Sequence, residues 1–146
     1  MTALVGKTRA MPADLAAWLR NPDTFIHCAM SIDGDPVELA RYQVAHLQDR
    51  TKFRIRQKAR GVGFSWVSAA EALAKAHLRD DYTAVFVSLN LEEAVEKIRY
   101  ASQLYETIPL KWRKRKVIDN RTSLEFEDST GRHRSRLISH PCKDPR

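Results

Sequence analysis

The chain has 146 residues, of which 43% are apolar and 29% are charged, and its net charge is +7. This length and composition are typical of one globular domain with a buried core, and no apolar run approaches the ~18 residues of a membrane span. The N-terminus lacks the apolar region of a signal peptide. The excess of Lys and Arg favours a polyanionic partner, such as nucleic acid or the phosphates of a nucleotide, although a basic surface without a specific partner stays open.

Cys28 and Cys142 are the only cysteines. They form neither a disulfide framework nor a C-x-x-C pair, so we expect a reducing, intracellular compartment. His27 beside Cys28, and His140 near Cys142, do not have a spacing that requires a metal site.

Residues 1–35 are predicted to form an N-terminal helical arm packed on a domain made of residues 36–146. A short helix is expected over residues 12–20, ended by Asn21, Pro22 and Asp23. An apolar segment of uncertain type follows at residues 24–30, and the D-G-D-P sequence at residues 33–36 predicts a turn.

Residues 36–50 predict a helix with Pro36 in its first turn and with Leu39, Tyr42, Val44 and Leu47 as its apolar members. Tyr42 and Gln43 come shortly before the stretch that organises the domain. A glutamine amide can pair with the edge of an adenine, and a tyrosine ring can pack on the base. A solvated helix glutamine is the simpler alternative.

Residues 53–78 predict a strand (53–58), a glycine turn (59–64) and a helix starting near Ser65. Apolar residues repeat along this helix at helical spacing: Trp66, Ala69, Ala70, Leu73 and Ala76. Gly61 and Gly63 permit a positive φ, and a glycine turn entering a helix N-terminus directs backbone N–H groups at one point, as in a phosphate cradle.

Cationic residues occupy every second position through the predicted strand and turn: Lys52, Arg54, Arg56, Lys58 and Arg60. In a strand they would share one face, with Phe53 and Ile55 on the other. Either they form an exposed basic edge, or Lys58 and Arg60 are directed at phosphates.

Residues 58–65, K-A-R-G-V-G-F-S, match the P-loop pattern G-x-x-x-x-G-K-[ST] in part. Gly63 supplies the second glycine and Ser65 the hydroxyl that binds Mg²⁺. Phe64 stands in place of the usual lysine, and Lys58 in place of the first glycine. A lysine at the end of the strand could span the loop to the phosphate oxygens, and Arg60 is a second candidate.

Residues 82–88 form a continuous apolar run, which predicts a strand buried on both faces of a parallel sheet. Asn90 is expected to cap the next helix with Glu93 as its capping-box partner, and Pro109 ends that helix. The strand at 53–58, the P-loop helix, this strand and this helix would make a βαβα unit. Two further strands are expected at 123–127 and 135–139, joined by a turn at 128–131.

A basic run surrounds one aromatic residue between these parts: Lys111, Trp112, Arg113, Lys114, Arg115 and Lys116. It could contact DNA phosphates while Trp112 packs or stacks. A solvated loop is the alternative.

Several of these segments resemble the large subunit of phage terminases, in its lambda-like and Mu-like branches, where the loop lysine stands at the start of the motif. The likeness lies in K-A-R-G-V-G-F-S, in the preceding Tyr-Gln pair, in V-S-L-N with the helix after it, and in S-L-E-F-E with its hairpin. It covers residues 36–146. The resemblance implies an α/β fold: an incomplete P-loop NTPase with a three-layer, mainly parallel sheet flanked by helices.

The resemblance also implies ATP and Mg²⁺ as cofactors and double-stranded DNA as a partner, in the cytoplasm of a bacterial host. Intact relatives also engage a small terminase subunit and the portal of the procapsid. In this reading Gln43 reads adenine, Lys58 or Arg60 neutralises phosphate, Gly61 and Gly63 shape the cradle, and Ser65 binds Mg²⁺. Val62, Phe64 and Trp66 complete the expected nucleotide-binding segment.

Hydrolysis in that family needs an Asp-Glu pair at the end of a further strand, and no such strand is expected after the glycine turn. The family's nuclease domain is absent too. We therefore expect a phage or prophage ATPase fragment that binds nucleotide weakly and hydrolyses it poorly or not at all. A non-catalytic, basic nucleic-acid-binding module is the main alternative, and a helicase-type domain with its second half on another gene is a third.

Overall fold

The computed structural model describes residues 21–142, so the predicted helix over residues 12–20 lies outside the described part. The helices are α2 (Pro22–Ala29), α3 (Arg41–Gln48), α4 (Phe64–Leu78) and α5 (Leu91–Thr107), with a short 3-10 turn, η1 (Leu110–Trp112). The strands are β1 (Ser31–Ile32), β2 (Asp35–Pro36), β3 (Thr83–Ser88), β4 (Arg115–Asp119), β5 (Ser123–Glu127) and β6 (Arg134–Pro141).

The main sheet has four strands in the order β3-β6-β5-β4. β3 runs parallel to β6, whereas β6 with β5 and β5 with β4 are antiparallel pairs. The chain is therefore an α/β protein with a mixed sheet, and the expectation of a mainly parallel sheet was wrong. The long hairpin of β5 and β6 makes the difference, because two strands joined by a tight turn can only pair antiparallel.

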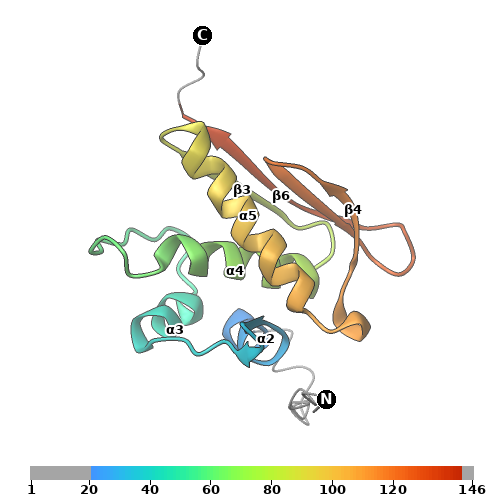
Figure 1. The fold of residues 1–146 in the computed structure, drawn as a ribbon, viewed down its shortest axis with the longest axis horizontal. Helices are drawn as coiled ribbons and strands as arrows, with labels where there is room; N and C mark the ends of the chain where they lie inside the picture. The colour runs from blue at the N-terminus through green and yellow to red at the C-terminus, as the bar shows by residue number, and fades with distance from the viewer. Residues whose placement is uncertain (1–20, 143–146) are drawn as a thin grey trace, which may run out of the picture.

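Helices α4 and α5 cover one face of this sheet, and α2 and α3 pack on the far side of α4 (Figure 1). The inward side chains of the sheet are fully buried against the helices, among them Leu124, Phe126 and Leu137. The opposite face carries Val85 and Val87, which are 57% and 68% exposed. Among the described residues no helix covers that face, so the third layer of the predicted fold is not seen in them.

One hydrophobic core joins all these elements. Phe25, Ile26 and Met30 from the predicted arm lie in the same buried cluster as Leu73 of α4 and Ile98 of α5. The described part of the arm, residues 21–35, therefore packs as part of this core.

The helix predicted to start near Ser65 is confirmed as α4. Ala69, Ala70, Leu73 and Ala76 are all fully buried, as their spacing indicated, while Trp66 packs partly buried at the edge of the core. Small alanines on this stripe allow α4 to lie close to both α5 and α2.

The prediction of a strand at residues 53–58 is wrong. This segment has no regular secondary structure, and Phe53 and Ile55 are 84% and 97% exposed. Two of its cations form ion pairs instead: Arg54 pairs with Glu71 of α4, and Arg56 with Asp49, the residue after α3. These bonds hold the backbone against the helices as a loop, and the βαβα unit lacks its first strand.

The position of strand β3 was predicted correctly, but its burial was not. It pairs only with β6 among the described strands, so it forms an edge of the sheet, and alternate side chains face solvent. The continuous apolar run therefore does not mark a strand buried on both faces.

Two helix starts were not foreseen. Asn21 is the N-cap of α2, and Pro22 occupies its first turn, where the missing N–H of proline costs nothing. α3 begins at Arg41, five residues after Pro36, which lies in β2.

Other predictions are confirmed. Asp33 and Gly34 adopt φ of 52° and 88° in the β1–β2 turn, and the Asn90 side chain accepts a hydrogen bond from the Glu93 N–H at the start of α5. β5 and β6 form the expected hairpin around the turn at 128–131. Across residues 21–142, none of the helices combines the length and the apolar character needed to span a bilayer.

Candidate functional site

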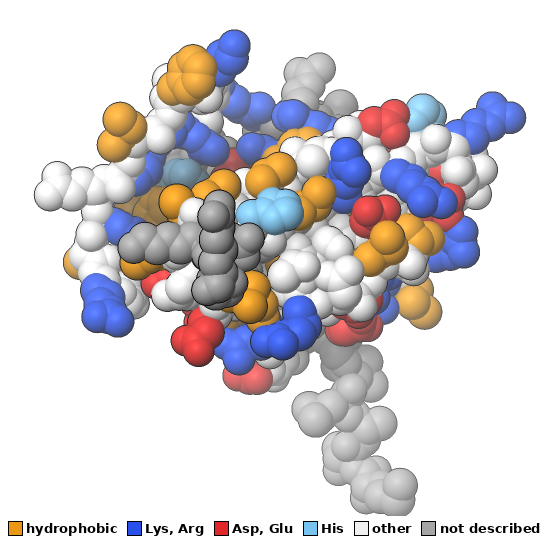
Figure 2. All heavy atoms as spheres, turned by 90° about the horizontal axis from the view of Figure 1, so that it is seen from above, with side chains coloured by type: hydrophobic (Ala, Val, Ile, Leu, Met, Phe, Trp, Pro, Cys, Tyr) orange, Lys and Arg blue, Asp and Glu red, His pale blue; other side chains and the backbone are white. Residues whose placement is uncertain are grey.

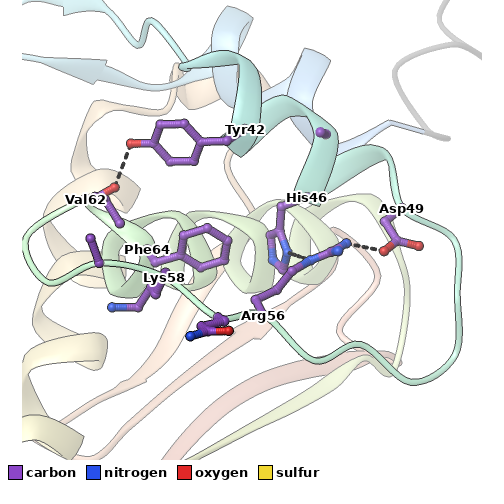
Figure 3. A pocket seen from close by; sticks show the side chains of 10 residues that line it. Tyr42, His46, Asp49, Arg56, Lys58, Val62 and Phe64 are labelled. Carbon is purple, nitrogen blue, oxygen red and sulfur yellow. Dashed lines mark hydrogen bonds and ion pairs between the residues drawn. The ribbon is translucent and has the colours of Figure 1, made fainter.

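A pocket of about 640 Å³ lies between α3 and the glycine loop that leads into α4 (Figure 3). This volume is within the range of ~300–1,000 Å³ that small-molecule sites occupy. Its lining comes from α3, from the loop after it and from the first residue of α4: Tyr42, Ala45, His46, Asp49, Arg56, Gln57, Lys58, Ala59, Val62 and Phe64.

Aromatic rings form one wall of the pocket. Tyr42 and His46 are one helical turn apart on α3, and both contact Phe64. The Tyr42 and Phe64 rings are nearly parallel, with centroids 6.4 Å apart and 16° between their planes. The His46 ring meets Phe64 edge-on at 4.8 Å. Since Tyr42 is 48% exposed, its ring is open to a planar ligand such as a nucleobase.

The glycine loop has the conformation that its sequence predicted. Gly61 and Gly63 adopt φ of 77° and 70°, in the left-handed region, and Gly63 is the cap residue of α4. The Tyr42 hydroxyl donates a hydrogen bond of 2.9 Å to the carbonyl of Val62, which joins α3 to the loop. The first amides of α4, starting with Phe64, have no intrahelical acceptor and carry the positive end of the helix dipole.

Gln43 lies against this loop. A Cβ atom added at Gly63 would lie 3.3 Å from the Gln43 amide nitrogen. The amide oxygen of Gln43, however, accepts a hydrogen bond of 2.9 Å from the Ala40 N–H and so caps α3. Gln43 would have to leave that cap to make a two-point contact with adenine, and it does not line the pocket.

The cations of the loop divide into two groups. Arg54 and Arg56 are paired with carboxylates, as described above. Lys58 and Arg60 form no hydrogen bond or ion pair with any residue in 21–142, so both are available to a ligand. Lys58 lines the pocket, although its ammonium points away from the ring of Tyr42 (Figure 3).

Glu71 of α4 is a buried carboxylate that bonds to His46, which lines the pocket, and to Arg54 of the loop. It accepts from Lys75 at 2.6 Å, from Arg54 at 3.1 Å and from Nε2 of His46 at 3.2 Å. Burial raises the pKa of Glu71, but the hydrogen bonds and charges of Lys75 and Arg54 outweigh it and hold the pKa below its ordinary value. Glu71 therefore stays ionised and ties the loop and α3 to α4.

His46 is neutral in this setting. Burial lowers its pKa, the carboxylate of Glu71 opposes that effect, and the positive charges of Arg54 and Arg56 add to it. The Arg56 Nε–H points at Nδ1 of His46 over 3.5 Å, so Nδ1 is the acceptor and Nε2 carries the proton towards Glu71.

Asp49 is the only carboxylate in the pocket lining. Hydrogen bonds from the hydroxyl and backbone N–H of Thr51, together with the charge of Arg56, lower the pKa of Asp49 to about 2. Asp49 is therefore ionised at neutral pH, and its charge is already neutralised by Arg56.

Of the residues predicted to bind nucleotide, Lys58, Val62 and Phe64 line the pocket. Six others do not: Gln43, Arg60, Gly61, Gly63, Ser65 and Trp66. Trp66 packs against the core, and Ser65 lies at the second position of α4. Residues 21–142 hold no group of three or more His, Cys, Asp or Glu side chains that could bind a metal.

The basic run at residues 111–116 is largely engaged within the protein. Arg113 and Lys116 both pair with Glu106, and Lys114 pairs with Asp80. These three side chains are 14–19% exposed. Lys111 lies over the Trp112 ring, and the exposed Arg115 pairs with Glu127. Phosphate contacts by this run would compete with these pairs.

Sequence reasoning named Tyr42 but missed His46, which builds the pocket wall from α3 together with it. His46 lies four positions after Tyr42, which places both on one side of a helix, and this spacing was a usable signal. Glu71 is harder to foresee, because a Glu within an alanine-rich helix resembles an exposed position.

No protein-family model matches this chain, and no curated protein matches its sequence. Function is therefore inferred from the pocket and from the motif-like loop.

Proposed function

We propose that this chain is part of a terminase large-subunit-like ATPase and that it binds ATP in the pocket between α3 and the glycine loop. The single observation that carries the proposal is the meeting of three features in one pocket. They are the exposed ring of Tyr42, the ammonium of Lys58, which has no partner within residues 21–142, and the glycine loop into α4, of which Val62 and Phe64 line the pocket. Tyr42 comes from α3 and the other two from residues 58–64, and each suits a different part of a nucleotide.

The phosphates suit the cationic side of the pocket. Lys58 and Arg60 supply positive charge and have no partner to give up within residues 21–142, and the first amides of α4 add N–H donors. The adenine ring suits Tyr42, whose neighbours Phe64 and His46 hold the aromatic wall in place. Gln43 is a cap and a spacer for the loop, and reads the base only if its bond to Ala40 opens.

Mg²⁺ would be held chiefly by the nucleotide phosphates and water, and the hydroxyl of Ser65 is the candidate ligand that the motif suggests. Mg²⁺ commonly keeps several waters in phosphate sites of this kind. The metal neutralises phosphate charge when bound. Asp49 is a poor ligand here because it is paired with Arg56.

DNA packaging, with double-stranded DNA, a small terminase subunit and a portal as partners, belongs to the same proposal. It is supported by the sequence resemblance alone. The alternative is a non-catalytic nucleic-acid-binding module that uses the basic residues between 52 and 60 together with residues 111–116. Its second part is weakened by the internal ion pairs of residues 111–116. Figure 2 shows Lys and Arg interspersed with Asp and Glu on one face, rather than gathered into one basic stripe.

Nucleotide binding can be tested by titrating a fluorescent ATP analogue with Mg²⁺ against the wild type and the Lys58→Ala variant. Loss of a charge-assisted contact of ~1.5–3 kcal/mol should weaken binding by roughly 10- to 100-fold. Arg132→Ala is the matched control, because it removes the same charge from an exposed turn between β5 and β6, at the other end of the molecule from the glycine loop (Figure 1). Equal affinity in all three proteins would remove Lys58 from the site, and no binding by the wild type would refute the proposal.

A further inference from the structure

A second pocket, of about 220 Å³, lies beside the first, and Asp49 lines both. More than half of its lining residues are cationic. They come from the loop after α3 and from the C-terminal end of α4: Arg50, Lys52, Arg54, Lys75 and Arg79. Asp49 is the only carboxylate in the lining, and it already pairs with Arg56.

Four of these cations have too few carboxylates around them within residues 21–142. Arg54 and Lys75 share the single carboxylate of Glu71. Within the same residues, Lys52 and Arg79 have no carboxylate in ion-pair range. These four side chains therefore carry net positive charge that an anion would offset.

Complementing the dipole of α4 explains only part of the cluster. Cations in the last turn of a helix interact favourably with its terminal carbonyls, which accounts for Lys75 and Arg79. It does not account for Lys52 and Arg54 of the loop, whose mutual repulsion costs free energy unless enough counter-charge is present.

An exposed aromatic residue stands beside this pocket. Phe53 comes between Lys52 and Arg54 in the chain, is 84% exposed, and has the Lys52 ammonium 5.5 Å from its ring centroid. Exposure of a whole phenyl ring to water is unfavourable in the absence of a partner. A basic hollow with an exposed ring at its side is the arrangement by which proteins hold a nucleic-acid strand, with phosphates in the hollow and a base on the ring.

We propose that this second pocket binds a backbone phosphate of a nucleic-acid strand, with Phe53 stacking on an adjacent base. The site is distinct from residues 111–116 and does not depend on nucleotide binding in the first pocket. A free phosphate or the phosphates of ATP would present the same chemistry to these cations. A free phosphate, however, carries no base, and ATP bound in the first pocket would not place its base on Phe53.

The test is the affinity of the full chain for a fluorescein-labelled single-stranded 20-nucleotide DNA, measured by anisotropy at several salt concentrations. In the Lys52→Ala/Arg79→Ala double variant, the slope of log affinity against log salt should fall by about 1.4, since each single-strand phosphate contact contributes ~0.7. At 0.1 M salt this corresponds to roughly 25-fold weaker binding. Both side chains are exposed, so the variant should fold, which its circular dichroism and thermal melt would verify.

The matched control is Arg121→Ala/Arg132→Ala, which removes two exposed positive charges elsewhere and should leave the slope within about 0.3 of the wild type. Phe53→Leu should weaken DNA binding by at least about fivefold without changing the slope of log affinity against log salt, because it removes the aromatic face and no charge. Equal loss in the two double variants would overturn the proposal in favour of general charge attraction. Displacement of the DNA by inorganic phosphate, at a concentration equal to that of the phosphate groups in the DNA, would overturn the nucleic-acid assignment. Lys58→Ala, which tests the first pocket, should retain DNA binding.

Discussion

Nε2 of His46 lies 3.2 Å from a carboxylate oxygen of Glu71, and this contact joins the aromatic wall of the first pocket to the body of α4. The same carboxylate holds Arg54, whose guanidinium also donates to the backbone carbonyl of His46 at 2.7 Å. One buried acid therefore sets the position of α3, of the loop and of α4 relative to one another. Both proposed ligand sites share this support, since His46 lines one pocket and Arg54 the other.

Replacing Glu71 with Gln should lower the free energy of unfolding by about 3 kcal/mol, because it keeps the shape but leaves Arg54 and Lys75 without their counter-charge. Urea denaturation followed by circular dichroism measures the change. Glu96→Gln is the control on α5: its carboxylate is 41% exposed and lies 3.8 Å from Arg99, so its loss should cost under about 0.5 kcal/mol. Similar values for the two variants would contradict a supporting role for Glu71.

His77 should make the protein less stable in mild acid. It is buried among the rings of Phe25, Tyr105 and Phe126, and burial lowers its pKa from 6.5 to about 4, against the opposing hydrogen bond to the Leu73 carbonyl. Between these two values the unfolded chain binds a proton that the folded chain does not. Stability is therefore lost as pH falls from 6.5 towards 4.

The matching variant is His77→Phe, which cannot titrate and also removes a buried ring nitrogen, Nε2, that has no hydrogen-bond partner. Relative to the wild type, its free energy of unfolding should rise by about 2 kcal/mol more at pH 5 than at pH 7. Parallel pH curves for the wild type and His77→Phe would contradict this assignment.

His133 should affect stability with the opposite sign. The hydrogen bond and charge of Asp81 raise the pKa of His133, so its contribution to stability is present at low pH and is lost as pH rises through the raised value. His133→Asn should therefore destabilise the protein most in acid.

Periodicity was enough to predict α4, α5 and the β5–β6 hairpin, because these elements each bury one face of a regular pattern. It failed at residues 53–58, where the alternation of Phe53, Arg54, Ile55 and Arg56 is that of a strand. Which carboxylates those arginines reach is decided by tertiary contacts: Glu71 lies 17 residues away from Arg54 in the chain. A pattern of alternating charges cannot distinguish a strand face from a loop held by two ion pairs.

The glycine loop was predictable for a different reason. Gly61 and Gly63 both require a positive φ, and no side chain can easily replace them there. The residues around the pocket were less accessible, because Tyr42, His46 and Asp49 acquire their roles only when α3 packs beside the loop. The Tyr-Gln pair marked the right part of α3, yet the structure gives its tyrosine rather than its glutamine a place in the pocket lining.

Alanine at Gly63 should be more harmful than alanine at Gly61. Both substitutions force a side chain into left-handed backbone, at a cost of about 1 kcal/mol. At Gly61 a Cβ meets nothing within 4 Å, whereas at Gly63 it lies 3.3 Å from the Gln43 amide nitrogen. Gly63→Ala should therefore show the lower unfolding free energy in urea. Adding Gln43→Ser, which shortens the side chain, should bring the cost at Gly63 towards that at Gly61, and a double variant without such recovery would show that the contact is unimportant.

Removing the Tyr42 hydroxyl should loosen the glycine loop without unfolding the protein. Tyr42→Phe keeps the ring against Phe64 but removes the 2.9 Å bond to the Val62 carbonyl. Because this bond is exposed, its loss is worth about 0.5–1 kcal/mol of local stability. Amide hydrogen exchange in residues 60–64 should become about two- to fivefold faster, while the core of α4 exchanges as before. Tyr100→Phe, which removes a bond to the Glu96 carboxylate on α5, is the control and should leave the loop unchanged. Unaltered exchange in Tyr42→Phe would mean that the glycines and Gln43 hold the loop without help from the hydroxyl.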